Sequence, residues 1–175
     1  MARNSFSLRI VPLALALLPC CFGSAECLEE IAGQNSATAE AERASRGYSL
    51  LVDTPLLKSD FTQEVFDNLW QVWPKALSEH ARSASPDVRR KMAFSRYGLT
   101  PRADNPEKPL QYVVDASGNW TMNCFACHGG TVYGKPVAGA PNNRLALQTL
   151  TEEVRRTKLQ LGKPLSRMDL GSLVI

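Results

Sequence analysis

The sequence is poor in several residue types that common classes of protein require. Of its 175 residues, two are histidine, five are cysteine and 7% are aromatic. No segment repeats along the chain, and no tract is biased enough in composition to be called low-complexity. A solenoid or other repeat architecture is therefore excluded. The remaining composition, 44% hydrophobic and 21% charged, is ordinary for a globular protein that can bury a core.

A hydrophobic run long enough to span a membrane is also missing near the N-terminus. The apolar run Ile10–Leu18 has about half of the ~20 residues that a membrane crossing needs. Arg3 and Arg9 precede it, and the small residues Gly23–Ala25 follow it. This order is typical of a secretory signal peptide. We therefore predict a signal peptide over residues 1–25, a periplasmic or secreted location, and no transmembrane segment after cleavage.

An excess of charge of one sign is absent as well. The full chain has 20 basic and 17 acidic residues, a formal net charge of +3. Loss of Arg3 and Arg9 with the signal peptide leaves 18 basic against 17 acidic residues, a net charge of +1. Such a balance lacks the basic footprint of a nucleic-acid-binding protein. We expect partners to be recognised by a local patch.

The cysteines are too few for a disulfide framework once the leader is removed. Cys20 and Cys21 lie in the leader, and a lipid anchor there is the weaker alternative because Pro19 precedes them. Cys27, Cys124 and Cys127 remain. An odd number so widely spread does not indicate paired disulfides. In an oxidising compartment, we do not expect the close pair Cys124 and Cys127 to remain as two free thiols.

Most of the mature chain has the signals of helices. Helical spacing and capping residues predict helices over residues 36–46, 60–73, 85–98 and 143–161. The second is expected to begin with Asp60 and Gln63 as a capping box, and glycines are expected to stop the other three. Prolines and charges predict an exposed connector over 100–109, and glycines and prolines predict a long loop over 129–141. A β-hairpin is predicted around Ser117–Asn119.

The largest aromatic residues recur at helical spacing at Phe66, Trp70 and Trp73. Such a stripe is more often part of a hydrophobic core than of a cofactor wall, and we interpret it as core.

Cys124-Phe125-Ala126-Cys127-His128 has three chemical interpretations. A structural zinc site needs four ligands, and no second pair at zinc spacing exists. A thioredoxin-type dithiol is expected in a βαβ setting, which the surrounding pattern lacks. The spacing C-x-x-C-H is that of covalent haem attachment, and the exported context favours this interpretation. Thiols three residues apart on one helical turn can reach two vinyl groups of a porphyrin, and the next residue, His128, can bind the iron.

With this motif, the chain resembles the c-type cytochromes, and in particular larger secreted bacterial haem proteins that carry a cytochrome c domain. The resemblance depends on "CFACHGG" at 124–130 and "GAPNN" at 139–143. It implies one covalent haem c per chain and a proline carbonyl that orients the ligand histidine. By that match, the carbonyl is that of Pro141, thirteen residues after His128.

The expected fold is mainly α: a cytochrome c-like haem domain with a helical N-terminal region and a small β-hairpin before the motif. The expected division is a signal peptide over 1–25, a helical region over 26–109 and a haem-binding region over 110–175. The apolar end "GSLVI" suggests a chain that continues beyond Ile175.

Two functional classes follow from the resemblance, and a third from its failure. The first is single-electron transfer in the periplasm, to redox partner proteins or to a second haem domain. The second is a haem-containing oxidoreductase, peroxidase- or oxygenase-like, or a part that feeds one electrons. Without haem, a zinc- or disulfide-stabilised binding module remains.

The distal iron ligand has few candidates. Met122 is too close in sequence to Cys124 to reach the opposite haem face, Met92 is expected in a helix core, and His80 at the surface. Met168 lies in a connector after the last predicted helix, where c-type cytochromes bring their methionine. We expect Met168 as the ligand, with a ligand beyond Ile175 and His80 as alternatives.

Overall fold

A computed structural model describes residues 25–171 of the chain and shows a mixed, mostly helical small domain, with 52% helix, 14% strand and small antiparallel sheets. The predicted signal peptide, except Ala25, and the last four residues lie outside the described part. The elements are α1 Ala25–Asp53, β1 Phe61–Thr62, α2 Gln63–Asn68, the 3-10 helix η1 Leu69–Val72, α3 Lys75–Ser83, α4 Pro86–Tyr97, β2 Tyr112–Val114, β3 Asn119–Met122, α5 Phe125–His128, β4 Gly129–Val132, β5 Lys135–Ala138, α6 Leu147–Gln160 and α7 Arg167–Gly171.

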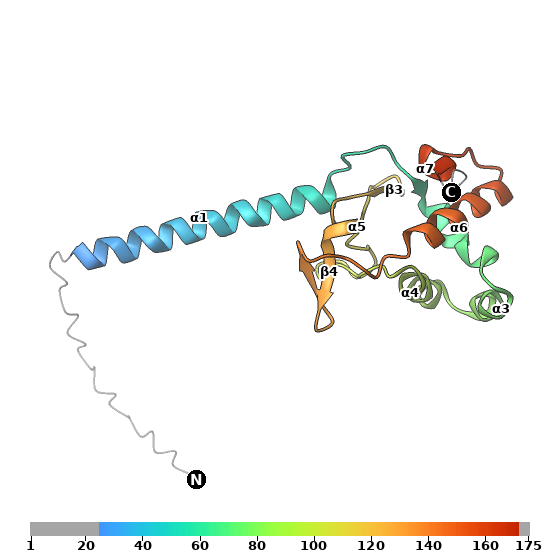
Figure 1. Ribbon diagram of the computed structural model, residues 1–175, viewed down its shortest axis with the longest axis horizontal. Helices are drawn as coiled ribbons and strands as arrows, with labels where there is room; N and C mark the ends of the chain where they lie inside the picture. Colours follow the sequence, from blue (N-terminus) through green and yellow to red (C-terminus); the bar gives the residue numbers. More distant parts are fainter. Residues whose placement is uncertain (1–24, 172–175) are drawn as a thin grey trace, which may run out of the picture. The chain divides into compact units, whose positions relative to one another are not determined.

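The chain divides into two compact units, with the boundary after Glu42 inside α1, which Figure 1 draws as one continuous helix. The second unit, from Arg43 onward, contains every element after α1. Within it, α3, α4 and α6 lie together, and residues from both 26–109 and 110–175 contribute to one core. Among the described residues, no helix has both the length and the hydropathy needed to cross a membrane.

The expected end of the first helix at Gly47 is wrong. α1 continues through Gly47 to Asp53, because its last turns pack Tyr48, Leu51 and Val52 against the rest of the second unit. Arg102, only 5% exposed, fixes this end by donating to the Val52 carbonyl at 3.0 Å and to Asp53 at 2.9 Å. Packing thus offsets the ~1 kcal/mol that a glycine costs inside a helix.

The expected capping box at Asp60 and Gln63 is also wrong. Residues 61–62 form the edge strand β1, which pairs with β3, and Thr62 is the residue whose side chain caps α2. Asp60 instead accepts a bond from the Met122 amide at 3.0 Å. The helix expected over 60–73 becomes α2 followed by η1, and Trp73 is extended before Pro74, as the residue preceding proline usually is.

Two sequence predictions agree closely with the structure. α4 begins with the Ser85 side chain accepting from the Val88 amide and ends at Gly98, whose φ of 66° is left-handed. The hairpin is formed by β2 and β3, with Val114 opposite Trp120. The last helix, α6, starts at Leu147, a few residues later than expected, and stops before Gly162, whose φ is 64°.

The core is built around Trp120. It is 1% exposed and stacks on Phe66, with ring centroids 4.3 Å apart, and on Phe61 at 5.3 Å. Phe66 and Trp73 are buried and Trp70 packs against the same cluster, so the core interpretation of the aromatic stripe is confirmed.

A buried polar network joins α4 to α6. Tyr97 donates to Glu153 at 2.6 Å and accepts from the Trp73 indole at 2.7 Å. Arg96 holds the same carboxylate through both of its oxygens. Burial and the bond to Glu153 raise the pKa of the Tyr97 hydroxyl above its usual value. These bonds stabilise the helix pair because each group would otherwise be buried without a partner.

Candidate functional site

The cysteine–histidine motif forms one turn of helix between two small sheets. α5, Phe125–His128, follows β3 and leads directly into β4, and Cys124 is its N-terminal cap. The side chains of Cys124, Cys127 and His128 are exposed, whereas those of Phe125 and Ala126 are buried. Residues at i, i+3 and i+4 share one helix face. The two free thiols and the imidazole therefore lie on the solvent side of the turn.

Phe125 anchors the opposite side of this turn. It is 4% exposed and packs in a small cluster with Val52 and Leu110. Its ring centroid lies 5.7 Å from that of Tyr48. Phe125, a spacer residue without a reactive group, thus determines which face of α5 is buried.

Asn123 holds the start of the turn. Its side chain accepts from the Phe125 amide at 2.9 Å and donates to the Leu110 carbonyl at 3.0 Å. Its own amide donates to the Gln111 carbonyl at 3.1 Å. The turn is consequently bound to the entry of β2 before the first cysteine is reached.

The segment 139–142 holds the end of the turn. The Asn142 side chain donates to the Ala126 carbonyl at 3.0 Å, and its backbone amide donates to the Cys127 carbonyl at 2.9 Å. The Gly139 amide donates to the His128 carbonyl at 2.7 Å. Three successive carbonyls at the end of α5, which a helix leaves without internal partners, are thereby satisfied.

The long loop predicted over 129–141 is wrong, because most of it forms the β4–β5 hairpin. Its turn is Tyr133–Gly134, with φ of 48° and 76°. This pair of left-handed residues closes a two-residue hairpin. The hairpin brings the segment 139–142 back beside the motif. An unstructured loop would not fix the position of this segment.

The two glycines after His128 permit a close approach. A Cβ at Gly129 would meet the Phe125 carbonyl oxygen at 2.6 Å, and a Cβ at Gly130 would meet the Pro141 carbonyl oxygen at 2.2 Å. Both obstacles are backbone atoms, so neither can move cheaply. The structure thus places the Pro141 carbonyl against Gly130, two residues after His128. The hydrogen bond expected from His128 to Pro141 stays a prediction.

Met168 lies in α7 rather than in a connector, and its half-buried side chain packs against the main core cluster. Met92 packs against the same cluster, as expected. His80 is exposed on α3. Met168 as the distal ligand stays a prediction.

The zinc and dithiol interpretations of the motif can be compared with the geometry of the described residues. No group of three or more histidine, cysteine, aspartate or glutamate side chains there could hold a metal ion. The paired strands of residues 25–171 are all antiparallel, unlike the βαβ setting of a thioredoxin-type dithiol.

Sequence reasoning missed Asn123 and Asn142 as residues that shape the site. The signal was present, because asparagine side chains frequently bond nearby backbone groups at turns and caps. What the sequence could not indicate is which backbone groups they meet. In comparisons with known proteins, no family model, curated protein or solved structure matches this chain.

Proposed function

We propose that the chain binds one haem c covalently through Cys124 and Cys127, with His128 on the iron, and transfers single electrons in the periplasm. The observation that carries this proposal is the shared exposed face of the two thiols and the imidazole on α5. Both thiols are free and face solvent, as thioether formation with a large planar group requires.

The surroundings of α5 are suited to a large apolar group. The β4–β5 hairpin that follows His128 exposes Val132 at 46%, Val137 at 38% and Tyr133 completely. Exposed apolar side chains on one hairpin can contact a bound apolar group. A porphyrin beside α5 would find apolar contacts on this hairpin.

Each part of the site has a definite task under this proposal. Cys124 and Cys127 hold the group, and His128 supplies the proximal nitrogen. Phe125 fixes the orientation of the turn by packing on its buried side, and Asn123 fixes it through hydrogen bonds at its start. Pro141 is proposed to orient the imidazole and Met168 to complete the iron coordination. The bound haem would supply the change of one electron between ferric and ferrous iron.

The test is export of the full chain in a bacterium that attaches haem c. The intact mass of the mature protein should equal that of a polypeptide from Glu26 plus one haem, and the reduced-minus-oxidised spectrum should be that of low-spin haem. Cys124→Ala and Cys127→Ala should each leave at most one thioether. Cys27→Ala is the matched control and should attach haem normally.

Two outcomes separate the proposal from its alternatives. A mass equal to the bare polypeptide would remove haem from consideration. Ready binding of carbon monoxide to the reduced protein would instead indicate an open iron site, as in a haem-containing oxidoreductase. His128→Ala should keep the covalent mass but lose the low-spin spectrum.

A further inference from the structure

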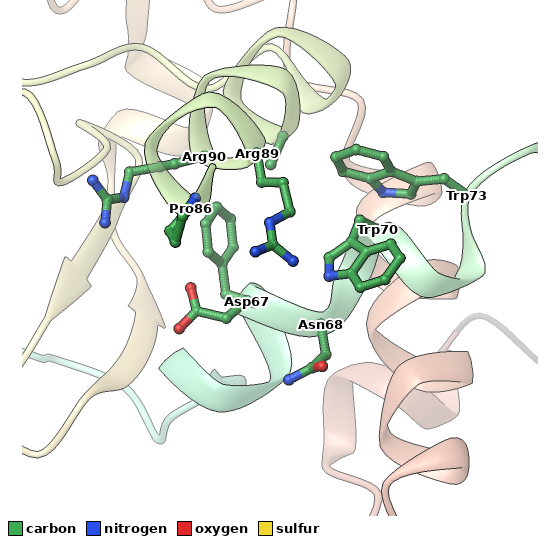
Figure 2. A pocket seen from close by; sticks show the side chains of 9 residues that line it. Asp67, Asn68, Trp70, Trp73, Pro86, Arg89 and Arg90 are labelled. Atoms are coloured by element: carbon green, nitrogen blue, oxygen red, sulfur yellow. The ribbon is translucent and has the colours of Figure 1, made fainter. Parts of the chain in front are cut away.

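A cavity of about 310 Å³ opens between the α2–η1 segment and the first turns of α4 (Figure 2). It shares no residue with the motif on α5. Its volume is at the small end of the range of ligand sites in proteins, about 300–1,000 Å³. A molecule of one or two rings would fit into it.

The apolar wall of the cavity is aromatic. Phe66 and Trp73 are nearly fully buried, and the half-buried Trp70 lies next to Trp73 in Figure 2. Such a wall favours a flat apolar molecule, because aromatic rings gain from stacking in addition to the burial of their area.

The charged side of the cavity is formed by two arginines, Arg89 and Arg90. Arg89 is half-buried and its Cζ lies 5.4 Å from the centroid of the Trp70 ring. Within the described residues, no hydrogen bond or ion pair of its guanidinium accompanies this contact. The neighbouring Arg90, in contrast, is paired with Asp87 and Glu107, each at 3.3 Å. The Arg89 guanidinium, which lies over the Trp70 ring, can therefore donate two parallel N–H hydrogen bonds to an anion in the cavity.

Asp67 limits the charge of that anion. Its Oδ1 accepts from the Gln63 side chain at 2.8 Å, and Asp67 lines the same cavity as Arg89 (Figure 2). A ligand with one carboxylate can meet Arg89 and keep its apolar part toward the ring wall. A second negative charge would meet Asp67.

We propose that this cavity binds a small aromatic molecule with a single carboxylate, which pairs with Arg89 while its ring lies against Trp70 and Trp73. The site is separate from the proposed haem chemistry, so either proposal can fail without the other.

Isothermal titration calorimetry of the mature full-length protein with benzoate tests this assignment, since calorimetry works with or without attached haem. Benzoate should bind saturably, with a dissociation constant on the order of 1 mM. Benzamide, which has the same shape and no charge, and acetate, which has the charge and no ring, should each bind at least tenfold more weakly. Terephthalate, with two carboxylates, should also bind more weakly than benzoate.

The variants identify the residues. Arg89→Gln should weaken benzoate binding at least tenfold and leave the far-ultraviolet circular dichroism unchanged. Arg82→Gln, which removes the charge of an exposed arginine outside this cavity, is the matched control and should bind like the wild type. Asp67→Asn should bring terephthalate binding to within about twofold of benzoate. If Arg89→Gln does not fold, Arg89→Lys keeps the charge without the planar fork and should weaken binding severalfold.

The proposal is overturned if benzoate gives no saturable heat, if benzamide binds as tightly as benzoate, or if Arg89→Gln has the affinity of the wild type. Binding of an acidic peptide in the absence of benzoate binding would also overturn it, because the cavity would then belong to a protein interface.

Discussion

The backbone amide of Asn142 donates a hydrogen bond to the carbonyl oxygen of Cys127 over 2.9 Å, while the Asn142 side chain donates to the carbonyl of Ala126. One residue thus satisfies two carbonyls of the turn that carries the proposed haem ligands. The conformation of α5 depends on a residue that lies beyond the β4–β5 hairpin, so the cysteine–histidine motif and the segment 139–142 act as one structural element.

Asn142→Ala should lower the free energy of unfolding by about 1 kcal/mol, because the Ala126 carbonyl loses its side-chain donor. We also expect a lower fraction of chains with attached haem, since α5 holds its shape less firmly. Urea denaturation and intact mass measure the two effects. Asn143→Ala is the matched control, since the adjacent Asn143 is exposed, and it should change neither quantity. Equal behaviour of the two variants would contradict the role given to Asn142.

Gly130→Ala should destabilise the protein by about 2 kcal/mol, because its Cβ would lie 2.2 Å from the Pro141 carbonyl oxygen and the backbone would have to move. Gly47→Ala should instead stabilise the protein. Gly47 lies within α1 and a Cβ there meets nothing within 4 Å, so alanine should stabilise the helix by about 0.5–1 kcal/mol. Thermal denaturation of both variants distinguishes close approach at one glycine from helix propensity at the other.

Tyr97 makes the stability of the protein sensitive to alkaline pH. Burial, with the bond to Glu153, raises the pKa of Tyr97 in the folded state, whereas an unfolded tyrosine titrates near pH ~10. Above that pH the unfolded chain loses this proton while the folded protein retains it. The free energy of unfolding should therefore fall as the pH rises, by at most about 1.4 kcal/mol per pH unit from this group.

Urea titrations between about pH 8 and pH 11 measure this decline. Tyr97→Phe should be less stable at neutral pH, because the Trp73 indole loses its acceptor and Glu153 a donor. Its stability should nevertheless decline less steeply with pH than that of the wild type. Tyr133→Phe, at a completely exposed position, should reproduce the wild-type decline. A parallel decline in Tyr97→Phe and wild type would show that Tyr97 is not responsible.

Met168→Ala tests the proposed distal ligand. If Met168 binds the iron, the variant should lose the weak near-infrared sulfur-to-iron band and its reduction potential should fall. Met92→Ala is the control, because Met92 also packs against the main core cluster. It should reduce stability and keep both the band and the potential. An unchanged band in Met168→Ala would exclude Met168 as the distal ligand.

The local signals of the sequence were sufficient where one or two adjacent residues decide the outcome. Ser85 and Gly98 delimit α4 through a side-chain cap and a left-handed glycine, both of which act within one turn. The hairpin of β2 and β3 and the core role of Phe66 and Trp73 follow likewise from patterns of neighbouring residues. The spacing of Cys124, Cys127 and His128 is enough to place these three side chains on one face of a helical turn.

Tertiary contacts decided what local patterns could not. Asp60 and Thr62 have similar capping chemistry, and only the pairing of residues 61–62 with β3 moved the cap from one to the other. Gly47 did not end α1, because the burial of Val52 outweighs a local glycine penalty. The sequence by itself determined the reactive groups and their spacing. The face of α5 that is buried was decided by Phe125 meeting Leu110, and the support of its carbonyls by Asn142. Both depend on segments distant in sequence, whose meeting is set by the free energy of the whole packed core rather than by any local preference.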